Sequence, residues 1–326
     1  DVVDVIKDEN NRIRSLKLAT TSGIKEVAGE VFIDATGDGQ LLSLGDFPWL
    51  KGDERSGKMQ ALTLFFRMGG IDVHRVAEYT KHHKQDFLEW MDFHYDFSRI
   101  ISIAGFKGPL KKAQQEGRAS SALEYIFFTT LPATGEASFN TTNVVGIDPS
   151  TSSELTRAEI QGHEQAAQVV DLLQHEIPGF EQAFLIDTAV QIGVRETRRA
   201  QSDYMMTGDD VRKQARFEEP IARASYGIDI HDPEKGKSRL EHLQRGSYYE
   251  IPKGSVMVKN AENLMVAGRC IGATWEGHSA LRVQPTSSAT GEACGAIAAL
   301  AVQNKQTIRE VPYSRIRERI RSNLED

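Results

Sequence analysis

Apolar and polar residues alternate at the start of the chain, first from Asp1 to Ile6 and again from Ile13 to Leu18, with a polar turn between the two runs. Successive side chains of a strand point to opposite faces, so this pattern predicts a β-hairpin. The apolar run 31–33 then leads into Asp-Ala-Thr-Gly-Asp-Gly, which predicts a short buried strand that ends in a glycine-rich turn. A hairpin at the very start has no earlier strand to pair with, so we expect a further segment upstream.

The middle of the chain, from about Gly45 to Pro252, changes to well-separated strands mixed with helices, which predicts a second domain. Strands are expected at residues 61–68, 125–131, 137–145 and 187–195. Thr156 and Glu159 have the spacing of a capping box, and apolar residues follow at near-helical spacing as far as Ile177. An amphipathic helix is therefore predicted to begin near Thr156.

The last part returns to strand, turn and helix. Residues 263–268 predict a strand, and residues 285–303 predict a helix rich in alanine, serine and glycine. Gly291 and Gly295 lie inside that helix, where each costs about 1 kcal/mol relative to alanine, so we expect tight packing or a nearby ligand to explain them. A final helix near Pro312 presents apolar residues on one face and exposes its arginines to solvent.

Composition narrows the class of protein. The 326 residues include 39 basic and 46 acidic side chains, and 40% of the residues are apolar, which predicts a globular protein with no charge footprint for nucleic acid. No apolar stretch approaches the roughly 20 residues of a membrane span. A small-molecule substrate is the expected partner, and a homo-oligomer is left open.

Two cysteines, Cys270 and Cys294, are the only ones in the sequence. They form neither a Cys-x-x-Cys pair nor an iron–sulfur ligand set, and we expect two buried thiols in a reducing compartment. The cytoplasm is therefore the default location, unless a signal peptide lies upstream.

Glycines mark two strand ends, at Gly37 and Gly268, but no Gly-x-Gly-x-x-Gly motif is present, because Leu42 occupies the third glycine position of the nearest candidate. The sequence therefore lacks the glycine motif that commonly binds the phosphates of a dinucleotide. The two strand ends frame the middle of the chain, as expected if one sheet is interrupted by an insertion. We expect residues 1–45 and 253–326 to form parts of a cofactor-binding domain and residues 46–252 to form a substrate domain.

Three stretches of sequence carry a resemblance to a known family. They are residues 31–39 with Ala-Thr-Gly, residues 190–199 with Val-Arg-Glu-Thr-Arg-Arg, and residues 262–295 with His-Ser-Ala-Leu-Arg. In this order they resemble the bacterial FAD-dependent oxidoreductase family, which is distantly similar to the fumarate reductase and succinate dehydrogenase flavoproteins. The resemblance implies an α/β fold in which a discontinuous, Rossmann-like FAD-binding domain, incomplete in this chain, carries an inserted α+β substrate domain.

The resemblance also implies residues that bind FAD. The family's turn beside FAD corresponds to Ala35, Thr36 and Gly37, with Asp38 as a neighbour; an ordinary strand-ending turn is the alternative. The family's strand end near the ribityl chain corresponds to Gly268 and Arg269, although the fumarate reductase relatives have an acidic residue in place of the arginine.

The small-residue helix opens with Pro285, Thr286 and Ser287. Its positive end can stabilise the negative charge of reduced flavin by roughly 0.3 to 2 kcal/mol, depending on burial.

His278 and Arg282 resemble the His-x-x-x-Arg pattern of the fumarate reductase relatives, in which the arginine holds the substrate near the flavin. The planar fork of a guanidinium suits a carboxylate because it donates two parallel hydrogen bonds. The alternatives are a structural imidazole for His278 and an internal ion pair for Arg282.

Arg195 and Arg198, together with Arg199, put three guanidiniums within five positions. They either line a pocket for an anionic substrate or pair with Glu196 and other acids. The cluster 229–232, Asp-Ile-His-Asp, matches no metal-ligand spacing and is interpreted as a turn network, so we assign no metal.

These observations favour an FAD-dependent oxidoreductase that transfers a hydride between a small anionic substrate and FAD, with His278 or an arginine handling the proton. The alternative is a non-catalytic or partner-dependent subunit that lacks its own pyrophosphate cradle. In either case a missing N-terminal segment or a partner chain is expected to complete the FAD site. The substrate and the electron acceptor stay open.

Overall fold

The computed structural model describes residues 1–131, 134–233, 238–321 and 324. Its contacts divide the chain into two compact units, which are described separately. Unit 1 comprises Asp1–Met59, Arg195–Ile230 and Ser238–Asp326, and unit 2 comprises Gln60–Val194 and His231–Lys237. Residues 46–59, 195–230 and 238–252, which we expected in the substrate domain, therefore pack with unit 1.

Unit 1 begins with an antiparallel sheet of β1 (Val2–Lys7), β2 (Ile13–Thr20) and β3 (Gly23–Ala28), and the β1–β2 hairpin is as predicted. Its other strands form pairs. The parallel pair is β4 (Phe32–Asp34) with β16 (Leu264–Val266). The other pairs are β5 (Trp49–Lys51) with β11 (Arg198–Ala200), β12 (Pro220–Ala224) with β15 (Tyr249–Pro252), and β13 (Ile228–His231) with β14 (Ser238–Glu241).

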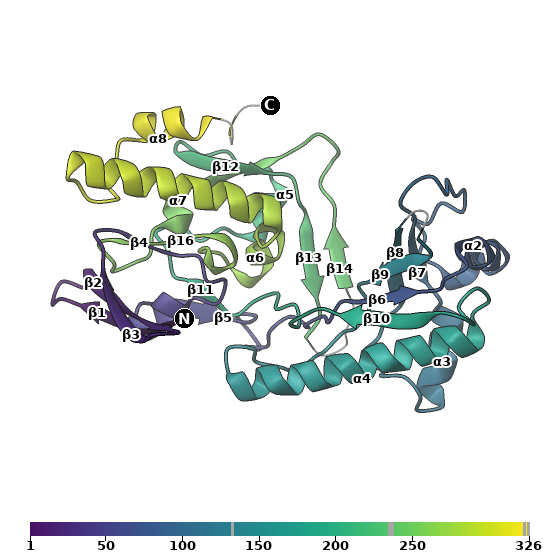
Figure 1. Ribbon diagram of the computed structural model, residues 1–326. Helices are drawn as coiled ribbons and strands as arrows, with labels where there is room; N and C mark the ends of the chain where they lie inside the picture. Colours follow the sequence, from purple (N-terminus) through teal and green to yellow (C-terminus); the bar gives the residue numbers. More distant parts are fainter. Residues whose placement is uncertain (132–133, 234–237, 322–323, 325–326) are drawn as a thin grey trace. The chain divides into compact units, whose positions relative to one another are not determined.

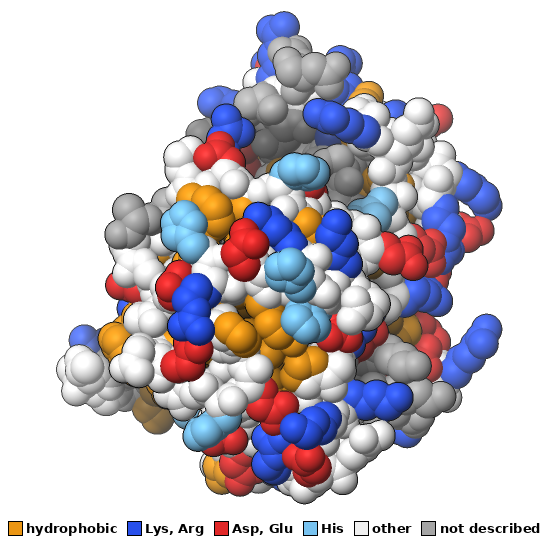
Figure 2. Space-filling model, turned by 90° about the vertical axis from the view of Figure 1, so that its right-hand side faces the viewer, with side chains coloured by type: hydrophobic (Ala, Val, Ile, Leu, Met, Phe, Trp, Pro, Cys, Tyr) orange, Lys and Arg blue, Asp and Glu red, His pale blue; other side chains and the backbone are white. Residues whose placement is uncertain are grey.

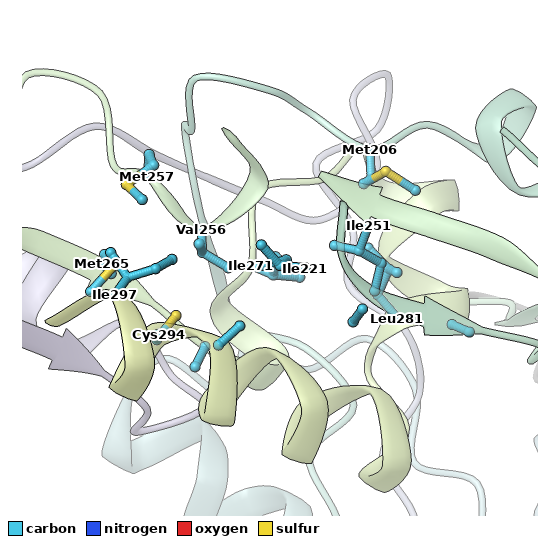
Figure 3. Close-up of a cluster of buried hydrophobic side chains, with 14 of the residues drawn as sticks. Met206, Ile221, Ile251, Val256, Met257, Met265, Ile271, Leu281, Cys294 and Ile297 are labelled. Carbon is cyan, nitrogen blue, oxygen red and sulfur yellow. The ribbon is translucent and has the colours of Figure 1, made fainter. Parts of the chain in front are cut away.

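The helices of unit 1 are α1 (Gln40–Leu44), α5 (Gly208–Arg212), α6 (Trp275–Leu281), α7 (Gln284–Asn304) and α8 (Tyr313–Arg319), with short 3-10 helices η2 (Lys253–Val256) and η3 (Gly268–Cys270). The long helix α7 packs against β12, η3 and β4 (Figure 1). Ile297 and Cys294 of α7 enter a buried apolar cluster with Met265 of β16, Ile221 of β12 and Ile251 of β15 (Figure 3). This cluster fixes α7 to the strands that carry the candidate site.

Unit 2 is built on a five-stranded sheet in the order β10-β6-β9-β8-β7. The strands are β6 (Phe66–Gly69), β7 (Ser102–Gly105), β8 (Ile126–Leu131), β9 (Glu136–Phe139) and β10 (Phe184–Thr188). The helices are α2 (Val73–His82), α3 (Lys107–Gln115) and α4 (Ser152–Glu176), with the 3-10 helix η1 (Lys84–Asp86). Helix α4 runs beside β10 and α3 (Figure 1), and the apolar residues between sheet and helices form a core of their own.

The surface carries mixed charge where it is visible. On the face drawn in Figure 2, basic and acidic side chains are interspersed with histidines and a small group of apolar side chains. Charges of both signs spread in this way give a weak long-range field, as the composition indicated.

Gly291 and Gly295 were expected to reflect either tight packing or a nearby ligand, and the structure answers the first of these. A Cβ atom added to either glycine would meet no atom within 4 Å outside the helix backbone, so close packing in the described structure does not explain them. Gly295→Ala is therefore expected to stabilise the protein by about 1 kcal/mol, because alanine has the better helix propensity. Urea unfolding measures this change.

The matched control is Gly39→Ala. Gly39 has φ +61°, and an added Cβ would lie 2.9 Å from the Cβ of Arg198, so this variant should lose stability. A Gly295→Ala protein that is less stable than the parent would contradict this prediction and would mean that another group packs against the helix at this glycine.

Candidate active site

The carboxyl ends of two parallel strands meet in unit 1. Val266 of β16 pairs with Asp34 of β4, and the N–H of Ala267 donates to the carbonyl oxygen of Asp34 at 3.1 Å. This register places the turn at residues 35–36 beside residues 267–268, although the two segments are far apart in sequence. In α/β folds, ligands bind at the carboxyl ends of such strands.

Asp34 organises the first turn. Its fully buried carboxylate accepts hydrogen bonds from the N–H and the hydroxyl of Thr36, at 3.1 and 2.7 Å, and from the N–H of Leu41 at 2.9 Å. The Thr36 hydroxyl also accepts from the N–H of Asp38 at 3.3 Å. Because that hydroxyl is used inside the turn, the exposed Ala35 and Thr36 offer a ligand mainly their backbone.

Arginine side chains hold the other side of the turn. Arg269 donates from Nε to the carbonyl oxygen of Gly37 at 2.9 Å and from Nη2 to the Asp38 carboxylate at 2.7 Å. Arg198 donates to the carbonyl oxygen of Asp38 at 3.1 Å, and the Thr197 hydroxyl donates to that of Gly37 at 3.3 Å. Gly37 has φ +79°, a conformation that favours glycine, and an added Cβ would lie 2.9 Å from Arg269 Nη2 and so displace that side chain.

Cys270 contributes a buried sulfur to the same turn. The N–H of Gly39 donates to Cys270 Sγ at 3.1 Å. Burial raises the pKa of the Cys270 thiol to about 12, so it remains a neutral thiol at physiological pH. Cys294 is likewise buried, and the prediction of two buried free thiols is confirmed.

The start of helix α7 lies against the second strand end. The N–H of Gly268 donates to the hydroxyl of Thr290 at 3.2 Å, and Gly268 itself has φ +69°. Helix α7 has 21 residues and begins without a side-chain cap; Pro285 is exposed at its start, Thr286 is buried and Ser287 half-buried. This end of the helix carries partial positive charge, which suits an anionic or electron-rich ligand.

Arg199 belongs to a buried ion-pair network. Its fully buried guanidinium donates to Glu196 at 3.0 Å, to the carbonyl oxygen of Gly52 at 2.9 Å and to Glu54 at 3.3 Å. The Trp275 indole N–H donates to the second oxygen of Glu196 at 2.8 Å. Arg199 therefore pairs with Glu196, which was one of the two interpretations of the arginine cluster.

Arg198 and Arg195 have different surroundings. Arg198 holds the Asp38 turn while its guanidinium lies over the Trp49 ring, 5.6 Å from the ring centre. Arg195 is half-buried, and its charge acts on the phenol of Tyr226. The structure thus brings Arg198 to the predicted FAD-binding turn and Arg195 to a separate cluster.

His278 is fully buried on α6. Its Nε2 lies 3.0 Å from the carbonyl oxygen of Arg269, so Nε2 carries the proton, and Nδ1 has no hydrogen-bond partner among the described residues. Burial holds the pKa of His278 well below its ordinary value, and the charges of Arg199, Arg282 and Arg269 add to the effect. The ring is therefore neutral, and its N–H positions Arg269.

The protonation of His278 predicts a pH dependence of stability. Below pH ~6.5 the unfolded chain binds a proton at this residue and the folded protein does not, so the free energy of unfolding falls as pH falls. Between pH 7.5 and 5.5 the protein should lose about 1.4 kcal/mol more than the His278→Gln variant does. Urea unfolding at both pH values measures this, and His94→Gln, which changes an exposed imidazole, should behave like the parent.

Arg282 follows directly after α6 and pairs with Asp229. Its Nη2 donates to the carbonyl oxygen of Asp229 at 2.9 Å and lies 3.5 Å from the carboxylate. Burial lowers the pKa of Arg282 and the carboxylate opposes that shift, so the guanidinium keeps its charge in a largely buried position. The internal ion pair that was the alternative for Arg282 is present in the structure.

Among the residues with described positions, no group of three or more His, Cys, Asp or Glu side chains is placed to hold a metal ion. Within the same residues, no helix is long and apolar enough to cross a membrane.

The strands and helices of the two units define a mixed α/β protein. The chain belongs to the FAD dependent oxidoreductase family, whose model matches residues 1–320. Its cofactor is FAD, and the exposed Ala35 and Thr36, the backbone of Gly268 and the uncapped start of α7 fit one part of that cofactor. The distant similarity to fumarate reductase flavoproteins stays a prediction from the motifs quoted above.

Solved structures similar to this chain include two flavin enzymes, whereas no curated protein matches it. One of them is a triple mutant of the flavin-dependent brominase Bmp2, which is 12% identical to this chain with a TM-score of 0.37. The match covers 98% of this chain and 54% of the brominase chain. The myxobacterial chondrochloren halogenase CndH is 11% identical with a TM-score of 0.35, covering 98% and 49%. The chain thus spans about half the length of each, and a likeness this remote carries no argument about the reaction.

Proposed function

We propose that this chain forms the substrate-handling and flavin-edge part of an FAD-dependent oxidoreductase that transfers a hydride between a small anionic organic molecule and FAD. The supporting observation is that residues 34–39, 197–198 and 266–270 converge on one turn in unit 1, beside the start of α7. Residues this far apart in sequence are held together by part-buried hydrogen bonds and one buried one, as expected of a preformed site. Membership of the family favours an enzyme over the non-catalytic alternative.

The chain's own residues have distinct roles in this proposal. Bound FAD supplies the hydride acceptor or donor. The backbone of Ala35, Thr36 and Gly268 contacts the cofactor, and the N-terminus of α7, at Pro285 to Ser287, stabilises negative charge near it. Arg269 and His278 keep the two strand ends in register with each other, since His278 holds the Arg269 backbone and the Arg269 side chain holds Gly37.

The substrate's anionic group is assigned to arginines. Arg282 and Arg195 are the proposed ligands, because both act on the same small region of unit 1, whereas Arg198 is committed to the Asp38 turn. Proton transfer at the substrate is assigned to a group other than His278, whose only N–H is held by a backbone carbonyl.

We also propose that a further segment of the same protein, or a partner chain, completes the FAD site, because the sequence contains no Gly-x-Gly-x-x-Gly cradle for the pyrophosphate. On this proposal the 326-residue chain alone binds FAD weakly. The FAD-binding domain would then be discontinuous and would be interrupted by an inserted substrate domain.

The test uses the complete gene product. Purified protein should show a flavin absorption spectrum, and the spectrum should bleach without oxygen when a suitable organic acid is added as donor. FAD should bind the complete protein more tightly than the 326-residue chain by at least about tenfold, since pyrophosphate contacts are lost from the latter. A correctly folded, colourless complete protein that takes up no added FAD would overturn the proposal.

A further inference from the structure

Thr290 joins helix α7 to the strand end at Gly268. Its hydroxyl accepts a hydrogen bond from the Gly268 N–H at 3.2 Å, and it donates to the carbonyl oxygens of Thr286 and Ser287, each at 3.0 Å. Threonines inside helices often bond back to the preceding turn in this way. Because the proton is used there, the hydroxyl offers its lone pairs to Gly268. The helix therefore sets the orientation of an acceptor for the strand end.

Cys294, which Figure 3 shows on α7, makes a second link to the same strand. Its thiol donates to the carbonyl oxygen of Val266 at 3.4 Å, which makes it the weaker of the two contacts. Burial raises the pKa of this thiol to about 12, so it keeps the proton that it donates. Residues four apart lie on one face of a helix, so Cys294 and Thr290 approach the strand from the same face. Together the two links fix both the rotation and the translation of α7 against the strand end.

The first turn of α7 lies directly against Gly268. A Cβ atom added to Gly268 would lie 3.5 Å from both Cβ and Oγ of Ser287, which is ordinary van der Waals contact. Thr290 is buried and Gly268 half-buried, so water competes little for the hydrogen bond between them. Loss of this hydroxyl would leave the Gly268 N–H without its acceptor at the point where strand end and helix meet.

We propose that Thr290 is a positioning residue for FAD, which keeps the backbone of Gly268 and the first turn of α7 at a fixed spacing. The proposal rests on the proposed function, which assigns both of these elements to the cofactor. Reduced flavin carries negative charge, and its stabilisation by the start of α7 depends on this spacing, because the effect of the helix charge falls off within the first turn. Thr290 acts through Gly268.

The first experiment compares Thr290→Val with Thr290→Ser in the complete protein. Valine keeps the branched shape and removes the hydroxyl, whereas serine keeps the hydroxyl. FAD binding is titrated by flavin fluorescence, and the midpoint potential of bound FAD is measured with redox dyes. Thr290→Val should weaken the binding of oxidised FAD about threefold and that of reduced FAD about tenfold, which lowers the midpoint potential by about 15 mV for two electrons. Thr290→Ser should stay close to the parent in both measurements.

The matched control is Thr142→Val in unit 2. The Thr142 hydroxyl likewise accepts a backbone N–H, from Leu64 at 2.7 Å, and donates to a backbone carbonyl, that of Leu64 at 3.0 Å. This variant loses the same kinds of hydrogen bond, but it involves none of the backbone that the proposal assigns to FAD. Thr142→Val should lower the urea midpoint of unfolding, as Thr290→Val does, and leave both FAD affinities and the potential unchanged. A merely structural role for Thr290 would make the two variants alike.

Hydrogen exchange tests the contact without flavin. In the complete protein freed of FAD, the amide of Gly268 should exchange faster in Thr290→Val than in the parent or in Thr290→Ser. The proposal is overturned if this exchange does not change, or if the midpoint potential of Thr290→Val equals that of the parent. A yellow, reducible parent whose potential ignores the substitution loses this positioning residue and keeps the oxidoreductase. A parent that takes up no FAD overturns the proposed function and this proposal with it.

Discussion

Replacing Arg199 with methionine is expected to lower the free energy of unfolding by about 3–5 kcal/mol, because the change removes the buried cation that donates to the Glu196 carboxylate. Both side chains are fully buried, and the Glu196 oxygens are divided between Arg199 and the Trp275 indole. Arg199 also joins this carboxylate to the Gly52 backbone. Methionine fills similar space but restores none of these hydrogen bonds.

Urea unfolding at pH 7 measures this loss. The control is Arg315→Met, which removes an exposed arginine whose pairing with Glu318 is loose, at 3.5 Å, and should change stability little. The double variant Arg199→Met with Glu196→Gln should recover part of the loss, because the amide keeps an acceptor for Trp275 without a buried charge. A single variant within 1 kcal/mol of the parent would show that Glu196 does not depend on this arginine.

Local pattern was sufficient for elements whose own residues decide their structure. The β1–β2 hairpin follows from alternation, and α7, predicted at 285–303, extends from Gln284 to Asn304. The final helix begins after Pro312 as expected, and its arginines are exposed. In each case the period of apolar residues matches the face that the structure buries.

Distant pairing decided the elements that the sequence mispredicted. The strand expected at 187–195 is β10, which ends at Thr188, and Gly193 instead forms an isolated bridge with Thr63. The capping box at Thr156 is also wrong. Helix α4 begins at Ser152, the Thr156 hydroxyl bonds within it, and Glu159 accepts the N–H of Ile192. Neither partner can be inferred from local spacing.

The candidate site, too, was predicted from the sequence only in part. The resemblance named Gly37, Asp38 and Arg269 separately, but only the structure shows that the arginine holds the turn, more than 200 residues away in sequence. The sequence indicated Cys270 only as a buried thiol and Glu196 only as a partner of the arginines, because their further contacts come from segments distant in sequence. Asp34 stood inside a quoted motif, and nothing in the sequence distinguished its carboxylate from an ordinary strand-end acid.

Asp34→Asn is expected to lower the free energy of unfolding by about 2–4 kcal/mol and to weaken the retention of FAD. The buried carboxylate uses both oxygens to accept hydrogen bonds, from Thr36 and from Leu41. An asparagine has only one side-chain oxygen. In either orientation of the amide, its NH2 group therefore faces another donor, which is either the Leu41 N–H or the N–H and hydroxyl of Thr36. The turn that carries Ala35 and Thr36 then loses the anchor that sets its shape.

The measurements are urea unfolding and the flavin content of the complete protein after gel filtration. Asp38→Asn serves as the control, because the Asp38 carboxylate is half-exposed and Arg269 also holds the neighbouring Gly37 carbonyl. Its effect on unfolding should be the smaller of the two. A variant Asp34→Asn that unfolds like the parent and keeps its flavin would contradict this prediction. The turn would then be held by Arg269, Arg198 and Cys270, and the Asp34 carboxylate would not be needed for FAD binding.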